Sequence, residues 1–353
     1  MAPSSTLLTF ALAGLVAHGS TGCGAMQESP ERAREPSAPL TARPMVPPEP
    51  TLALAGAPKC TVGEASNIGV VSEDLSLDIA IAANRDGALI AWDTDREHFA
   101  VRRLDHAGRP VGAARSVVRN GFSVDLQPQP DGTFVLSTDE LCGPKHSCLD
   151  VLTLDRDGVV LGPPARAEFG DRELSFDVRA TARGALWMAT PTTLTPREAT
   201  TWWIARAIPH DGQPATLNVE DVADMPTEGG DGWLEAAPDG RWIVQWTDNA
   251  RTSFAEKIEG KPARRAPGQL DFRFRARVDT GVTSGGPDGH LDGLLFHRYL
   301  GPNRHRTTLI VSEDDVDRAF AWTGERFLVA YSSGKHPHRT IHVVPVDCRP
   351  DTQ

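Results

Sequence analysis

Short apolar runs alternate with glycine-containing turns along the chain from about residue 75 to its end. Five turns contain Gly87, Gly132, Gly184, Gly240 and Gly324, and each is followed by an apolar run such as Ala88–Trp92. A second run then alternates apolar and polar residues and ends before another turn, as His98–Leu104 does. These lengths and patterns predict β-strands, the first kind buried on both faces, and no segment has the period of an amphipathic helix.

The turn glycines recur at intervals of 45, 52, 56 and 84 residues, and the last interval fits two units, one of them degenerate, between residues 271 and 313. Repeats of this length, each with three or four short strands, are typical of β-propeller blades. We therefore expect an all-β fold, a β-propeller of six blades of about 42–56 residues. In this repeat architecture the chain resembles secreted bacterial β-propellers over roughly residues 60 to 349, without resembling one enzyme family.

The last repeat ends one strand short of a full blade, at Arg339–Val346. We expect the segment Thr61–Val71 to supply the missing strand, because closure by an N-terminal strand removes the open sheet edges that invite aggregation.

The five cysteines are Cys23, Cys60, Cys142, Cys148 and Cys348. Cys142 and Cys148 flank a short turn-forming insert, and Cys60 and Cys348 stand at the two ends of the repeat region. We expect two disulfides, Cys142–Cys148 and Cys60–Cys348, the second tying the first strand to the last. The alternative is four unpaired buried thiols.

The N-terminus has the pattern of an export signal. The apolar run Leu7–Ala17 is too short to span a bilayer and has the length of a signal-peptide core, which predicts a signal peptide over residues 1–22. The residues Ser20-Thr21-Gly22-Cys23 resemble the lipobox of bacterial lipoproteins. That resemblance implies a lipid-modified Cys23 as the first residue of the mature protein, and the alternative is an ordinary secretory signal.

Eight prolines between residues 24 and 58 prevent a helix or a central strand there. We expect residues 23–58 to be a lipid anchor and extended linker, followed by a propeller domain over residues 59–349. The expected location is the outer membrane or cell surface, and without the lipid it is the periplasm or the medium.

The chain carries 36 Lys and Arg against 47 Asp and Glu, a net charge of −11, and has no basic cluster. Nucleic acid is excluded as a partner, because phosphate binding needs a clustered basic face. The 40% hydrophobic residues suffice for a packed core but not for a membrane-spanning bundle.

The loops after the second strand of each blade differ in every unit, and variable loops on a rigid scaffold usually carry binding residues. They lie at the opposite end of the blades from the short glycine turns. Seven side chains in these loops are candidates for ligand binding: Asp93, Asp95, Asp139, His146, Asp248, His336 and His338. No metal site or cofactor is expected, because no ligand set has the required spacing.

The chain lacks a Gly-x-Ser-x-Gly elbow, a phosphate-binding loop and a His-Glu-x-x-His motif. The sequence therefore favours a monomeric, non-catalytic lipoprotein that binds an envelope protein or glycan through its variable loops. One alternative is a glycan-active hydrolase or lyase that uses loop carboxylates, which would need two of them about 5 to 9.5 Å apart. Another is a structural lipoprotein of an envelope complex.

Overall fold

The computed structural model describes residues 59–71, 78–95, 97–118, 121, 123–143, 146–169, 174–191, 200–225, 232–236, 242–248, 251–257, 264–265, 281–284, 294–301, 304–311, 317–334 and 338–349. Every regular element in these ranges is a β-strand, so the fold is all-β as predicted. None of these residues belongs to a helix long and apolar enough to cross a membrane. The expected signal peptide, Cys23 and the proline-rich linker lie outside the described residues.

The described strands form six antiparallel sheets, which we number 1 to 6 along the chain. Sheet 1 contains β3 (Ile79–Asn84), β4 (Gly87–Asp93), β5 (His98–Leu104) and β6 (Pro110–Val118). Sheet 2 contains β7 (Asp125–Pro128), β8 (Phe134–Gly143), β9 (His146–Leu154) and β10 (Ala165–Phe169). Sheet 3 contains β11 (Leu174–Thr181), β12 (Gly184–Pro191), β13 (Thr200–His210) and β14 (Gln213–Met225).

Sheet 4 contains β15 (Gly232–Ala236), β16 (Trp242–Asp248), β17 (Arg251–Lys257) and β18 (Arg264–Arg265). Sheet 5 contains β19 (Gly281–Ser284), β20 (Leu294–Gly301) and β21 (Arg304–Val311). Sheet 6 contains β22 (Arg318–Trp322), β23 (Phe327–Ser333) and β24 (Arg339–Arg349), joined by β1 (Lys59–Val62) and β2 (Ser66–Val71). Sheet 5, which corresponds to the degenerate repeat, has three strands among the described residues.

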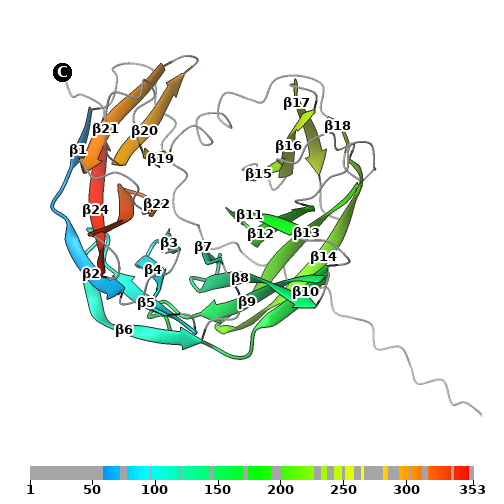
Figure 1. The fold of residues 1–353 in the computed structure, drawn as a ribbon, viewed down its shortest axis with the longest axis horizontal. Coiled ribbons are helices and arrows are strands. Elements are labelled where there is room, and N and C mark those ends of the chain that lie inside the picture. Colours follow the sequence, from blue (N-terminus) through cyan, green and yellow to red (C-terminus); the bar gives the residue numbers. More distant parts are fainter. Residues whose placement is uncertain are drawn as a thin grey trace, which may run out of the picture. The chain divides into compact units, whose positions relative to one another are not determined.

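Sheets 1 to 4 are four-stranded meanders, in which each strand pairs with the next along the chain (Figure 1). The first strands of neighbouring sheets contact one another: β22 with β3, β3 with β7, β7 with β11, β11 with β15, and β19 with β22. Four-stranded antiparallel sheets that meet along their first strands are consistent with a β-propeller.

The hydrophobic core is divided among the interfaces between sheets. Strand β4 is buried along its whole length. Its residue Leu89 packs with Leu126 between sheets 1 and 2, whereas Ile90 packs with Ile341 between sheets 1 and 6. Burial on both faces explains why the run after Gly87 is continuously apolar.

Sheet 6 is built from both ends of the chain. Strands β1 and β2 pair with β24 one after the other, with Cys60 opposite Cys348 and Val71 opposite Arg339. A disulfide joins Cys60 to Cys348, as predicted. The expected N-terminal strand is present, divided into two, and it covers the edge of β24 that would otherwise be open to pairing.

The Asp-x-x-Gly turn of sheet 2 packs that sheet onto sheet 1. The Asp155 carboxylate accepts hydrogen bonds of 2.8 Å from two main-chain N–H groups of its own turn. Gly158 follows with φ +77°, and a Cβ at this position would lie 2.9 Å from Val101 of β5. Glycine is therefore required both by the backbone conformation and by the close approach of the two sheets.

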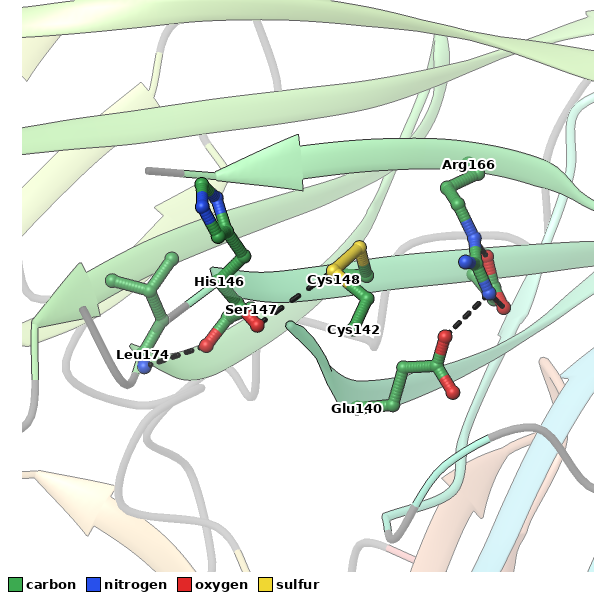
Figure 2. Close-up of a disulfide and its surroundings, with 8 residues drawn as sticks. Glu140, Cys142, His146, Ser147, Cys148, Arg166 and Leu174 are labelled. Carbon is green, nitrogen blue, oxygen red and sulfur yellow. Dashed lines mark hydrogen bonds and ion pairs between the residues drawn. A yellow bond between two sulfur atoms is a disulfide. The ribbon is translucent and has the colours of Figure 1, made fainter. Parts of the chain in front are cut away.

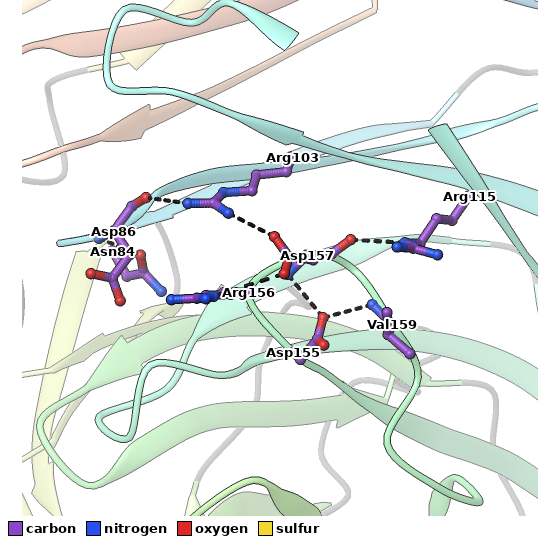
Figure 3. Close-up of polar contacts among 8 residues, drawn as sticks. All are labelled: Asn84, Asp86, Arg103, Arg115, Asp155, Arg156, Asp157 and Val159. Atoms are coloured by element: carbon purple, nitrogen blue, oxygen red, sulfur yellow. Dashed lines mark hydrogen bonds and ion pairs between the residues drawn. The ribbon is translucent and has the colours of Figure 1, made fainter. Parts of the chain in front are cut away.

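Charged groups hold the same turn from outside the core (Figure 3). Arg103 of β5 donates to the Asp157 carboxylate at 2.7 Å. Arg115 of β6 donates to the main-chain oxygen of Asp157 at 3.1 Å. Two strands of sheet 1 thus bind one turn of sheet 2.

The two disulfides close loops of very different length, and we expect them to contribute unequally to stability. Replacing Cys60 and Cys348 by Ser should lower the free energy of unfolding by about 5 kcal/mol, because 288 residues separate them. Replacing Cys142 and Cys148, six residues apart, should lower it by about 2 kcal/mol. Urea unfolding without reductant measures both, and equal losses would contradict the role of Cys60–Cys348 as the closing bond.

Candidate functional site

A pocket of about 220 Å³ lies between sheets 2 and 3, near the beginnings of β7 and β11. Its lining consists of Ser123, Asp125, Ser137, Thr138, Asp139, Leu149, Leu174, Phe176 and Trp187. The set combines two carboxylates, three hydroxyls, two aromatic rings and two leucines. Such a mixture suits a small ligand with several polar groups and an apolar face.

The alternation of side chains along β7 points the Asp125 carboxylate into the pocket. Its neighbours Val124 and Leu126 belong to the core between sheets 1 and 2. Successive side chains of a strand point to opposite faces, so Asp125 faces sheet 3. Ser137 lies opposite it on β8, and Asp139 follows two residues later on the same face.

The wall of the pocket on β8 and β9 is a disulfide-bonded hairpin (Figure 2). The segment from Asp139 to Ser147, which the sequence predicts as a variable loop, is instead a hairpin: β8 continues to Gly143 and β9 begins at His146. The Cys142–Cys148 bond, predicted correctly, holds this extension closed. The hydroxyl of Ser147 accepts a bond of 3.2 Å from the Leu174 N–H and so fixes the start of β11.

A charged triad braces the reverse side of that hairpin (Figure 2). Arg166 of β10 donates two hydrogen bonds to Asp150 of β9, at 2.7 and 2.6 Å, and one to Glu140 of β8. Asp150 is buried, and bidentate pairing of this kind restricts geometry as well as adding energy. Three strands of sheet 2 are thereby held in register behind the pocket.

The aromatic side of the pocket comes from sheet 3. The buried Trp187 donates its indole N–H to the Ser137 hydroxyl at 3.0 Å, which links the two sheets. Phe176 packs against Phe169, with 5.6 Å between ring centroids. Both pocket rings are therefore fixed in position before any ligand binds.

Burial in an acidic neighbourhood raises the pKa of Asp125 to about 7. Loss of solvation is the main cause, followed by the charges of Asp177, Asp139 and Asp78, and Arg179 opposes them only in part. Burial also raises the pKa of Asp177, although Arg179 and the Leu234 N–H bind its carboxylate. A carboxyl that titrates near neutral pH inside a pocket is typical of functional sites.

Among the loop candidates whose side chains the structure describes, only Asp139 lines the pocket. Asp93 is fully buried and accepts a bond from the Asp78 N–H. Asp95 accepts from the Glu97 N–H, a contact that lowers its pKa, so it closes a turn.

The other candidates whose side chains the structure describes do not line the pocket. His146 and His338 are exposed. His336 and the Asp248 side chain lie outside the described residues. Within the described part of the chain, no three His, Cys, Asp or Glu residues are grouped as a metal site.

Asp125 is not among the residues predicted from the sequence, although the repeat contains a signal for it. An apolar residue followed by Asp stands at or near the beginning of several first strands, as in Val124-Asp125, Phe176-Asp177 and Val316-Asp317. The repeat period could have aligned these positions.

We expect Asp125 to cost stability at neutral and alkaline pH. Its folded pKa of about 7 lies above the ordinary 3.8, so the folded state holds this proton more tightly between those values. The resulting stabilisation is complete below about pH 4 and is lost as pH rises through 7. Asp125→Asn should therefore raise the free energy of unfolding at pH 8 by roughly 2 to 4 kcal/mol, and far less at pH 4.

Urea titrations of both proteins at pH 4, 6 and 8 measure this difference. Asp95→Asn, at a turn, is the matched control: because the pKa of Asp95 is lowered, its substitution should not raise the free energy of unfolding more at pH 8 than at pH 4. A constant difference between Asp125→Asn and the unmodified protein would show that Asp125 ionises normally.

Comparisons with known proteins give no family for this chain. No protein-family model matches, and no curated protein matches. Similar solved structures include a protein of unknown function from Dyadobacter fermentans, with TM-score 0.46 and 11% identity over 82% of this chain and 99% of that one. A neuraminidase-like protein of A/little yellow-shouldered bat/Guatemala has TM-score 0.45 and 7% identity over 82% and 100%. The GH43_1 enzyme from Xanthomonas citri, complexed with xylose, has TM-score 0.39 and 12% identity over 80% and 89%.

Proposed function

We propose that this protein is an exported, surface-tethered, six-bladed β-propeller that binds a glycan of the cell envelope without cleaving it. The glycan binds in the pocket between sheets 2 and 3. The six described sheets, the contacts between their first strands and the closure of sheet 6 by β1 and β2 support the propeller assignment. The signal-like N-terminus, Cys23 and the proline-rich linker support export and tethering.

The lining of the pocket is the observation that carries the binding proposal. Asp125 and Asp139 accept hydrogen bonds from sugar hydroxyls, and Ser123 and Thr138 both accept and donate them. The Phe176 ring offers an apolar surface to the C–H face of a sugar ring. At about 220 Å³ the pocket is smaller than the usual site for a drug-sized ligand, which favours one sugar unit at the end of a chain.

A second candidate function is glycan cleavage, and one observation favours it. Asp125 has a pKa of about 7, so at neutral pH a large fraction of it is protonated beside a second pocket carboxylate, Asp139. A protonated carboxyl is the general acid that glycosidases use to protonate the leaving oxygen. Asp139 would then act as base or nucleophile.

A glycan-binding screen with the purified protein tests the primary proposal. Envelope oligosaccharides should bind, and Asp139→Ala should weaken binding by at least about tenfold, because a buried donor of the ligand loses its acceptor. Asp95→Ala removes a loop carboxylate outside the pocket and should leave binding unchanged. Equal binding by both variants would show that the pocket is not the binding site.

The same incubations distinguish binding from cleavage. Mass spectrometry of the recovered oligosaccharides should find them intact if the protein only binds. New reducing ends that disappear in Asp125→Asn would instead establish the second candidate.

Lipid attachment has its own test. Mass spectrometry of the mature N-terminus should find a lipid-modified Cys23, and Cys23→Ser should release the protein from the membrane fraction. An unmodified Cys23 in the membrane-bound protein would contradict the proposed anchor.

A further inference from the structure

The first strands of sheets 2, 3 and 6 carry an aspartate at equivalent positions. Asp125 and Asp177 lie on β7 and β11, and Asp317 directly precedes β22. Strand alternation makes each carboxylate face the next sheet. The side chains beside Asp125 and Asp177 belong to the core shared with the preceding sheet, so these two aspartates face the following one. Asp317 lies on the same face as Ala319 and Ala321, which pack toward sheet 1. The three carboxylates thus repeat one position of the fold.

Two of these carboxylates are neutralised by an arginine. Asp177 accepts from Arg179, two residues further along the same strand, at 2.6 Å. Asp317 accepts at 2.6 Å from Arg339, which begins β24. Each also has a neutral donor, the Leu234 N–H for Asp177 and the Ser332 hydroxyl for Asp317.

Sheet 2 has no arginine at the positions that correspond to Arg179 and Arg339. Gln127 stands two residues after Asp125, where sheet 3 has Arg179. In sheet 2, Asp125 pairs with Ser137, which pairs with Val151, just as Ser332 pairs with Ile341 in sheet 6. Arg339 lies two residues before Ile341. The residue two before Val151 is Leu149, so Leu149 stands where sheet 6 has Arg339. In the part of the chain that the structure describes, the Asp125 carboxyl has neither a hydrogen-bond nor an ion-pair partner.

The pocket lies where that counter-charge is missing. Asp125 and Leu149 both line it. We infer that the pocket selects a sugar with a free, protonated amino group, an inference that rests on the proposed glycan-binding function. The ammonium of this sugar binds Asp125 in place of the absent guanidinium.

The charges around the pocket agree with this ligand class. Asp139, Asp177 and Asp78 all interact unfavourably with ionised Asp125, and Arg179, the cation that opposes them, is already bound to Asp177. An ammonium group relieves that repulsion, whereas a carboxylated or sulfated sugar adds to it. N-acetylation removes the charge and enlarges the group, so the acetylated sugar loses the main attraction.

Calorimetry with two probes tests the inference, using the disaccharide of glucosamine and its N-acetylated counterpart at pH 7. The amino form should bind at least about tenfold more tightly, since a charge-assisted hydrogen bond replaces a neutral one. Asp95→Asn should keep this preference. Asp125→Asn should reduce it to about twofold or less.

A gain of charge provides a second test that does not remove the carboxylate. Gln127→Arg introduces the guanidinium that sheet 3 has at this position, so it should occupy Asp125 and abolish the amino-sugar preference. Thermal melting checks that the variant is folded, and the matched Gln127→Glu variant should preserve or strengthen the preference.

The outcomes separate the two proposals. Tighter or equal binding of the acetylated disaccharide by the unmodified protein overturns the amino-sugar inference and leaves glycan binding in place. Absence of binding by every sugar of the screen, including these two, overturns both. Retention of the preference by a folded Gln127→Arg or by Asp125→Asn shows that Asp125 does not hold the ammonium.

Discussion

Burial of the central strands on both faces is the constraint on which the rest of the structure depends. Strand β4 has no exposed residue, and its two faces contribute to different cores, one shared with sheet 2 and one with sheet 6. A sheet of this kind leaves apolar surface in water unless neighbours cover both sides. The last sheet must therefore meet the first, and pairing of β24 with β1 and β2 ties the two ends of the chain together at that place.

A scaffold fixed in this way lets one repeated position acquire different roles. The aspartates of sheets 3 and 6 are bound by Arg179 and Arg339. In sheet 2 the corresponding residues are Gln127 and Leu149, and a pocket lies beside Asp125 instead. The raised pKa of Asp125 means that the folded protein bears an electrostatic cost here, which is the usual sign of a residue kept for function and not for stability.

Local signals were enough to predict several of the strands, their glycine turns and the cysteine pairs. His98–Leu104 is β5 with the predicted limits, because an alternating run between two turns has few other conformations available. The hairpin at residues 139–147 was mistaken for a loop, because Gly143 and the residues after it have turn composition. Its extension depends on the Cys142–Cys148 bond and on Arg166, which reaches it from a strand nearly twenty residues further along the chain.

The sequence by itself determined the all-β fold, the repeat, the N-terminal strands of the last sheet and both disulfides, since each follows from periodicity or from residue spacing along the chain. Only the tertiary structure selected Asp139 from seven loop candidates and placed it beside Asp125. The pocket draws its residues from β7, β8, β9, β11 and β12, or from positions just before them, and its charge balance depends on cations present in other sheets and absent in this one. Distances and burial between segments so far apart arise only when the sheets pack, and burial is what shifts the Asp125 proton toward neutral pH.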